Sequence, residues 1–185
     1  MVAPITSSDG TLLGILAIDR MPFLALNEEN LQMLSVMLGY YADCVVEAEG
    51  TRRFFEQFAD APTDFAAEFS RLLRLQRNYG INSHIAVLSF GNDESGRQAI
   101  THLARIRRGL DIPWQLEVGG RMVLANLMPL ASEEAVEGYL LRIETMLKEY
   151  MGIGYDTWSL TPVEISLAES DPMTSLMRAT KGVPA

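Results

Sequence analysis

Two consecutive glycines, Gly119 and Gly120, separate two apolar runs at residues 114–118 and 122–130. A Gly-Gly loop allows positive φ at both central positions, which is the backbone conformation that the tightest β-hairpin turns require. The sequence therefore predicts an antiparallel hairpin at this point. Because a two-stranded hairpin is only marginally stable in water, the rest of the chain must supply strands or helices that cover it.

The residues on either side of this hairpin alternate between helical and strand-like apolar patterns. Apolar side chains at helical spacing, such as Phe65, Phe69 and Leu72, mark the helices, and short continuous apolar runs mark buried strands. The predicted helices are 64–78, 95–108, 132–150 and 172–181, and the further strands are 84–90 and 163–167. This order, αβαββαβα, favours an α/β chain of the α+β type, in which helices flank a central, mostly antiparallel sheet.

Residues 1–50 differ from the rest of the chain in charge. They hold seven acidic residues and one basic residue, a net charge of −6, whereas the whole chain has −9 and the remaining 135 residues therefore have −3. The change in composition near Gly50 and the Arg52-Arg53 pair predicts a domain boundary.

Within residues 1–50, apolar runs at 2–5 and 12–18 flank a Ser-Ser-Asp-Gly turn and predict a strand pair. Asn27 is expected to cap a helix that reaches Glu49 and has two apolar stripes, with Cys44 as a small buried side chain. Two strands and one helix cannot enclose a core, so we expect the end of a larger domain. One stripe would cover that domain's sheet, and the other is either left exposed or forms the seam of a homodimer.

The overall composition excludes several classes of protein. The chain has 24 Asp and Glu against 15 Lys and Arg, which disfavours a nucleic-acid polymer as partner. Its longest apolar runs are far shorter than the roughly 20 residues that cross a bilayer, so we expect a soluble chain without an export signal. With one cysteine and two histidines, His84 and His102, we expect no disulfide, no metal and no cofactor.

Two parts of the chain resemble known domain families. Residues 1–50 resemble the closing hairpin and helix of a GAF domain, through the segments 3–5, 9–10, 13–18 and 26–29. Residues 63–185 resemble a GGDEF domain, the fold of diguanylate cyclases. There, residues 85–90 correspond to the family's first strand, and residues 163–181 are similar to its closing strand and helix. Residues 51–62 are then expected to be a linker.

The resemblance to GGDEF domains does not extend to the metal site. A diguanylate cyclase holds two divalent cations between acidic side chains, because phosphoryl transfer needs metals to neutralise charge. At the end of the family's first strand this chain has Leu-Ser-Phe-Gly-Asn, residues 88–92. If Gly119-Gly120 is the remnant of the GGDEF motif, Arg121 takes the acidic position; if the family's spacing is kept, the motif falls on residues 117–121 and is equally lost. We therefore expect an inactive cyclase, with no catalytic residue.

The tetrapeptide Arg-Gly-Leu-Asp at residues 108–111 lies just before the hairpin, where the family has its inhibitory RxxD site. An arginine can donate to O6 and N7 of guanine, and a carboxylate can accept from its N1–H and N2–H edge, so the two together recognise guanine. Residues 97–108 contain four arginines and no acid. We expect Arg108 and Asp111 to lie at a helix end and to bind a guanine nucleotide.

The resemblance implies one more arginine about thirty residues downstream, on the next helix. Arg142 is the only arginine of that helix and is the candidate. Arg105 lies three residues before Arg108 on the same predicted helical face and is the second choice. Two alternatives stay open: Arg142 pairs with Glu137 or Glu144 on the helix surface, and the arginine-rich helix is a solvated face.

A GAF end joined to a degenerate GGDEF domain, with the run from Arg20 to Leu31, resembles the PelD family of cyclic di-GMP receptors over nearly the whole chain. This resemblance implies cyclic di-GMP as the ligand and Pel exopolysaccharide synthase and export proteins as partners. It also implies a parent protein at the cytoplasmic face of the bacterial inner membrane, with spanning helices upstream. The alternative is an interaction scaffold of a polysaccharide secretion complex that binds no nucleotide.

Overall fold

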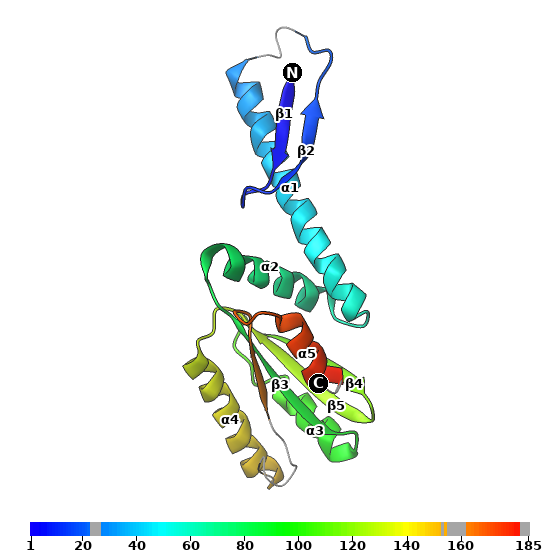
Figure 1. The fold of residues 1–185 in the computed structure, drawn as a ribbon. Coiled ribbons are helices and arrows are strands. Elements are labelled where there is room, and N and C mark those ends of the chain that lie inside the picture. The colour runs from blue at the N-terminus through cyan, green and yellow to red at the C-terminus, as the bar shows by residue number, and fades with distance from the viewer. Residues whose placement is uncertain (23–26, 153, 155–161, 182–185) are drawn as a thin grey trace. The chain divides into compact units, whose positions relative to one another are not determined.

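The structure is a computed structural model that describes residues 1–22, 27–152, 154 and 162–181. The chain forms two compact units, Met1–Arg53 and Phe54–Ala185, and each is described by itself (Figure 1). None of the helices in the described ranges combines the length and the hydropathy needed to cross a membrane.

The first unit contains the predicted strand pair and the predicted helix. Strands β1 (Val2–Thr6) and β2 (Leu12–Ala17) pair antiparallel, and Gly10 has a φ of 87° in the turn between them. Helix α1 (Glu28–Gln57) is capped by Asn27, whose Oδ1 accepts from the backbone N–H of Asn30 at 2.8 Å. Residues 23–26 of the run from Arg20 to Leu31 lie outside the described residues.

One expectation for the first unit was wrong. Cys44 is exposed rather than buried. Met37 and Tyr40, which lie with Cys44 on the second apolar stripe of the helix, are exposed as well. A hairpin of two strands is too narrow to cover more than one side of a helix. The second stripe of α1 therefore has exposed side chains in this structure.

The second unit is built on a four-stranded antiparallel sheet. Its strands are β3 (His84–Gly91), β4 (Ile112–Val118), β5 (Arg121–Met128) and β6 (Val163–Ser166), in the order β4-β5-β3-β6. Gly119 and Gly120 connect β4 and β5 with φ values of 59° and 73°. The predicted hairpin is confirmed, because both glycines have the left-handed backbone that the turn needs.

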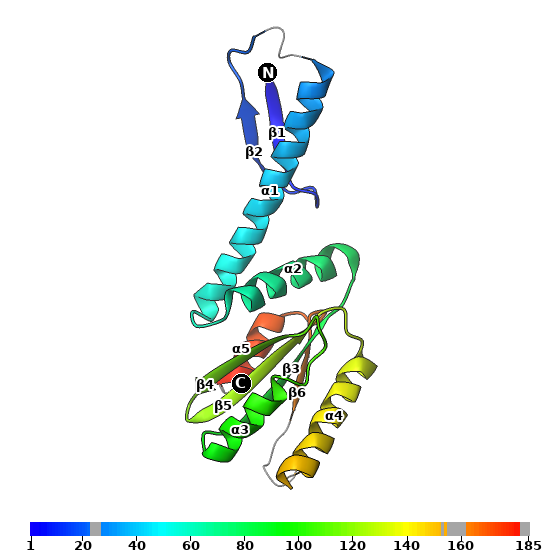
Figure 2. The same ribbon diagram turned by 180° about the vertical axis from the view of Figure 1, so that it is seen from behind.

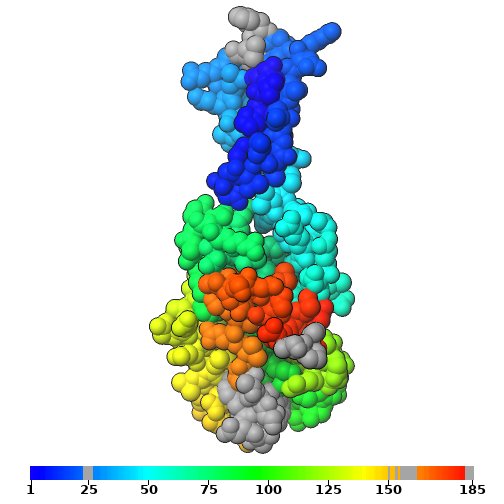
Figure 3. Space-filling view, viewed as in Figure 1, coloured from blue at the N-terminus to red at the C-terminus, as the bar shows by residue number. Residues whose placement is uncertain are grey.

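Helices cover both faces of this sheet (Figures 1 and 2). Helices α2 (Thr63–Tyr79) and α5 (Pro172–Lys181) pack on the face to which Ile85 and Val87 point. Helices α3 (Glu94–Leu103) and α4 (Glu133–Met151) pack on the face of Ala86 and Leu88. In the space-filling view, β6 and α5 (orange to red) cover one side of the unit (Figure 3). The predicted α/β fold with a mostly antiparallel sheet is confirmed.

The segment 51–62, expected to be a linker, contributes to the core of the second unit. Helix α1 continues to Gln57, and Phe54, Phe58 and Ala61 are buried. The rings of Phe54 and Phe69 lie 4.9 Å apart, and those of Phe58 and Trp114 lie 5.3 Å apart. Large apolar side chains draw this segment onto the sheet, because their burial stabilises the fold.

Helix α3 is shorter than predicted and ends at Leu103 instead of residue 108. Beyond it the hydrogen bonds tighten from four-residue to three-residue spacing, with Arg105 N donating to His102 O at 3.1 Å and Ile106 N to Leu103 O at 2.9 Å. Three closely spaced arginines and the following Gly109 disfavour continuation of the helix. Three of the four arginines of residues 97–108, Arg105, Arg107 and Arg108, therefore lie after the end of α3.

Candidate ligand-binding site

The loop between α3 and β4 positions the two residues of the RxxD pattern. Asp111 N donates to Arg108 O at 3.1 Å, which closes a four-residue turn around Gly109 and Leu110. Leu110 points into solvent with 67% of its surface exposed, whereas Asp111 is buried directly before β4. Arg108 and Asp111 are brought together as predicted, but by a turn rather than by a helix end.

The carboxylate of Asp111 is almost fully engaged by Arg108. Its Oδ2 accepts from the backbone N–H of Arg108 at 3.0 Å, and its Oδ1 accepts from Arg108 Nε at 3.0 Å and lies 2.9 Å from Arg108 Nη2. The side chain of Asp111 is 0% exposed and that of Arg108 is 38% exposed. Charge-assisted bonds of this kind are about twice as strong as neutral ones. The guanidinium thus covers the carboxylate and keeps one edge toward solvent.

Two other segments of the chain complete this site. Asn126 on β5 donates from Nδ2 to Asp111 Oδ2 at 3.4 Å, and Arg108 Nη2 donates to Pro129 O at 3.4 Å in the loop before α4. The next residue, Leu130, has a φ of 55° and 58% of its surface exposed, and its N–H donates to Ser83 Oγ at 3.0 Å. The site is therefore built from the α3–β4 loop, strand β5 and the β5–α4 loop.

Asn126 was not identified from the sequence. It is the single polar residue among the apolar side chains of residues 122–128, and such an interruption in the middle of a buried strand was the available signal. Its partner is 15 residues away, across the β4–β5 pairing that sets Asn126 opposite Pro113. Local pattern alone does not reveal that contact.

In the part of the chain that the structure describes, Arg142 makes no hydrogen bond or ion pair with Arg108 or Asp111. It is exposed on α4, nine residues after Glu133 and so about 13 Å along the helix. Its Nη1 would lie 3.7 Å from a Cβ placed on Gly138, so the guanidinium lies over that glycine. Glu144, one of its expected partners, pairs with Lys148 at 2.6 Å. Among the described side chains, no ion pair joins Arg142 to Glu137 or Glu144.

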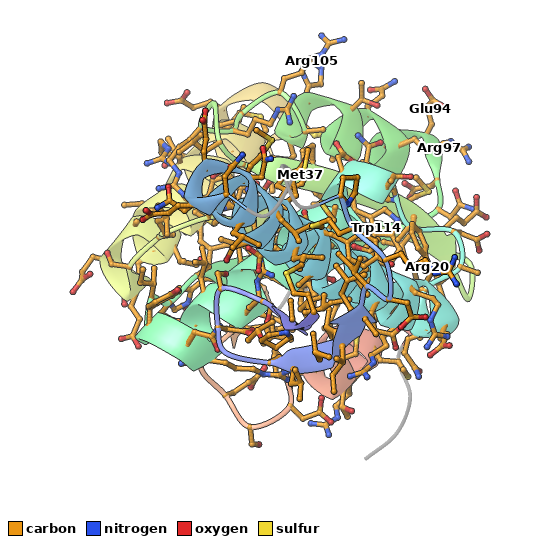
Figure 4. The ribbon with its side chains drawn as sticks, turned by 90° about the horizontal axis from the view of Figure 1, so that it is seen from above. Arg20, Met37, Glu94, Arg97, Arg105 and Trp114 are labelled. Carbon is orange, nitrogen blue, oxygen red and sulfur yellow. The ribbon has the colours of Figure 1, made fainter. Side chains whose placement is uncertain are left out.

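Arg105 does not share a helical face with Arg108, because α3 has already ended at Leu103. Its side chain is exposed and points away from the second unit (Figure 4). The expected helical face shared by Arg105 and Arg108 was therefore wrong.

At the end of β3, where the family has a metal ligand, polar side chains form a network. Asn92 Nδ2 donates to Glu117 Oε1 at 2.5 Å, and Arg97 Nη1 donates to Asn92 Oδ1 at 2.8 Å. Asp93 caps α3 by accepting from Gly96 N at 2.7 Å. The guanidinium of Arg97 is thus part of the polar network at the end of β3.

A separate cavity of about 640 Å³ lies on the other face of the sheet. The hairpin, β6 and α5 line it, with Arg121, Arg178 and Lys181 as its cationic side chains. None of Arg105, Arg108, Asp111 and Arg142 is among its lining residues. This cavity is therefore separate from the RxxD site.

Comparisons with known proteins agree on one family. The model of the PelD GGDEF domain family matches residues 59–181, and a comparison with curated proteins gives no match. PelD from Pseudomonas aeruginosa PAO1 has 23% identity and a TM-score of 0.57, over 99% of this chain and 65% of that one. Its complex with c-di-GMP has 24% identity and a TM-score of 0.55, over 97% and 63%.

A complex of PelD from P. aeruginosa PA14 with c-di-GMP has 25% identity and a TM-score of 0.52, over 97% of this chain and 61% of that one. The chain therefore spans less than two thirds of the length of these structures. The similarity at these identities is one of fold.

Proposed function

Because the chain belongs to the PelD GGDEF domain family, we propose that it binds cyclic di-GMP and acts as a receptor for it. Two of the similar solved structures are complexes of PelD with this dinucleotide, which supports the choice of ligand. The family match covers residues 59–181, which include the RxxD site and helix α4. The second unit is thus the part that would bind the messenger.

The pairing of Arg108 with Asp111 is the observation that carries this proposal. It brings a guanidinium and a carboxylate to one point of the surface, which is the combination that recognises guanine and disfavours adenine. The half-exposed Arg108 presents donors for O6 and N7 of the base. Asp111 is covered, so it can accept from the N1–H and N2–H edge of the base only after Arg108 has turned toward the ligand.

Arg142 and Arg105 would contribute positive charge to the same ligand. Both side chains are exposed, and α4 begins directly after the loop whose Pro129 O accepts from Arg108. Two intercalated cyclic di-GMP molecules present four phosphate groups, so guanidinium groups beyond Arg108 have partners at the site. We assign Arg142 to this role first and Arg105 second.

The same domain would not synthesise cyclic di-GMP. By the resemblance to GGDEF domains, the Arg97–Asn92–Glu117 network would replace one metal-binding acid, and Arg121 would replace another if Gly119-Gly120 is the remnant of the motif. Guanidinium groups at these positions would repel Mg²⁺. Incubation with GTP and Mg²⁺, followed by chromatography, is expected to leave GTP unconverted. Formation of the cyclic dinucleotide would overturn this part of the proposal.

In the cell, the receptor would couple cyclic di-GMP to Pel exopolysaccharide synthesis and export at the inner membrane. A second candidate is a scaffold that binds protein partners without a nucleotide, with residues 1–50 as the end of a GAF domain. The exposed apolar side chains of α1, among them Val36 and Tyr40, favour it. They also suit the seam of a homodimer. Titration with cyclic di-GMP separates the receptor from the scaffold.

The test is calorimetric titration of the full chain with cyclic di-GMP. We expect binding to the unchanged chain, and Arg108→Ala to weaken it by about tenfold to a hundredfold, because the bidentate contact to guanine is lost. Arg77→Ala removes one exposed arginine of α2 and serves as the control with unchanged affinity. Equal binding by the Arg108→Ala and Arg77→Ala chains would contradict the site, and no binding by the unchanged chain would favour the scaffold.

A further inference from the structure

Asn126 is a buried polar residue in the middle of the central strand β5. It is 1% exposed, and its neighbours Leu124 and Met128 on the same face of the sheet are packed against α3 and α4. Its Oδ1 has no hydrogen-bond partner among the residues that the structure describes. Burial of an unpaired amide oxygen costs stability, so such a residue calls for an explanation.

The amide of Asn126 is aimed at the RxxD site. Its Nδ2 lies 3.4 Å from Asp111 Oδ2, and the orientation is fixed because an ionised carboxylate can only accept hydrogen bonds. The unpaired Oδ1 is bonded to the same carbon atom as Nδ2, so it belongs to the planar amide group that contacts Asp111. Asp111 and Asn126 are equally buried, at 1% each.

We infer that Asn126 is a positioning and specificity-determining residue of the guanine site. This inference rests on the proposed function. When Arg108 turns from Asp111 to the ligand, Oδ1 of Asp111 loses its contacts with Nε and Nη2, while Oδ2 keeps the backbone N–H of Arg108 and the amide of Asn126. Asn126 thus holds the carboxylate of Asp111 in an orientation in which the freed Oδ1 of Asp111 faces the base.

The unpaired oxygen of Asn126 gives the site a second acceptor. Guanine presents two adjacent donors, N1–H and N2–H, and the freed Oδ1 of Asp111 together with Oδ1 of Asn126 matches them. Adenine has an acceptor at N1 and carries no amino group at its C2 position, so it cannot use this pair. The ligand class that the pair selects is therefore a guanine nucleotide, and the polar atom without a partner obtains one only when guanine binds.

The test compares cyclic di-GMP with cyclic di-AMP on the full chain, using calorimetry and thermal melting. Asn126→Leu removes both polar atoms at nearly constant size. We expect its affinity for cyclic di-GMP to fall by about tenfold or more, its affinity for cyclic di-AMP to stay unchanged, and its melting temperature not to fall, because a poorly paired buried amide is lost. A residue with only a structural role would weaken both ligands equally and lower the melting temperature.

Asn126→Ser is the second variant and keeps a small polar group if the leucine variant does not fold. Its expected loss of cyclic di-GMP affinity is smaller, again without an effect on cyclic di-AMP. Unchanged discrimination between the two dinucleotides in the folded variants would overturn the inference while the unchanged chain still binds cyclic di-GMP. Failure of the unchanged chain to bind would instead overturn the proposed function, and the inference with it.

Discussion

At the scale of single residues, the buried carboxylate of Asp111 determines how this surface can take up a ligand. Arg108 supplies most of its hydrogen bonds, and Asn126 supplies the remaining one. A base that reaches Asp111 must therefore replace the side chain of Arg108, since an ionised carboxylate left unpaired in the interior is costly. Binding of a base at Asp111 would therefore exchange its contacts with Arg108 for contacts with the base.

Leu130, in the loop that contacts Arg108, has an unfavourable backbone conformation. Its φ of 55° places it in the left-handed region, where a branched side chain costs about 1–2 kcal/mol. Leu130→Gly removes this strain but gives the unfolded chain more freedom. We expect the free energy of unfolding, measured with urea, to rise by about 0.5–1 kcal/mol.

Leu110→Gly is the matched control for Leu130→Gly. Leu110 is an exposed leucine of the same site, but its φ is not in the left-handed region. Glycine at position 110 only increases the conformational entropy of the unfolded chain, so the free energy of unfolding should fall. Equal losses in both variants would show that the conformation of Leu130 stores no strain.

The RxxD pattern could be predicted from the sequence because it is local: four residues form one turn, and its arginine and aspartate lie within reach of each other. The cover that Arg108 places over Asp111 could not be predicted. It depends on the burial of Asp111 against the sheet and on the carbonyl of Pro129, which lies 21 residues after Arg108 in the chain. Asn126 was missed for the same reason.

At the scale of elements, the hairpin and the succession of helices and strands along the chain followed from local chemistry, whereas the end of α3 did not. Gly119 and Gly120 define their turn whatever surrounds them. The apolar positions of residues 103–110 are compatible with a longer helix. The chain instead forms the turn in which Arg108 binds Asp111 directly before β4. A tertiary contact thus overrides helical periodicity at the site itself.

The start of α3 makes a close contact with the end of β3. A Cβ on Gly96 would lie 1.9 Å from the carbonyl oxygen of Gly91, which is a backbone atom that cannot turn away. Gly96→Ala must therefore displace the helix from the strand. We expect the free energy of unfolding, measured with urea, to fall by about 1–3 kcal/mol.

Gly138→Ala serves as the control within the same unit. Gly138 lies inside α4, and a Cβ there would meet only Arg142 Nη1 at an ordinary 3.7 Å. Alanine is the better helix former by about 1 kcal/mol, so stability should rise. If both alanine variants are stabilised alike, the Gly91–Gly96 contact is not tight in solution.

At the scale of the whole molecule, the order of helices and strands was predictable because both faces of the sheet are apolar at regular spacing. The part played by residues 51–62 was not predicted, although Phe54, Phe58 and Ala61 have helical spacing, because the spacing does not show what they pack against. They become core residues through contact with α2, which follows directly, and with Trp114 on β4.

The two units should differ in local stability. Strands β3 and β5 lie inside a four-stranded sheet covered on both faces, whereas β1 and β2 form a two-stranded sheet with exposed Val2 and Ile15. We expect backbone amides of β3 and β5 to exchange hydrogen for deuterium far more slowly than those of β1 and β2. Equal protection of both sheets in native-state exchange would contradict this expectation.

The salt bridge between Arg108 and Asp111 also bears on the concentration at which the protein would respond. Under the proposed function, Arg108 would compete with the nucleotide for the carboxylate of Asp111, and because both belong to one chain, dilution would not weaken this competition. The apparent Kd is then the intrinsic one divided by the fraction of molecules with the bridge broken. A substitution that changes only the strength of this bridge would reset the threshold of the response and leave every group that touches the nucleotide in place.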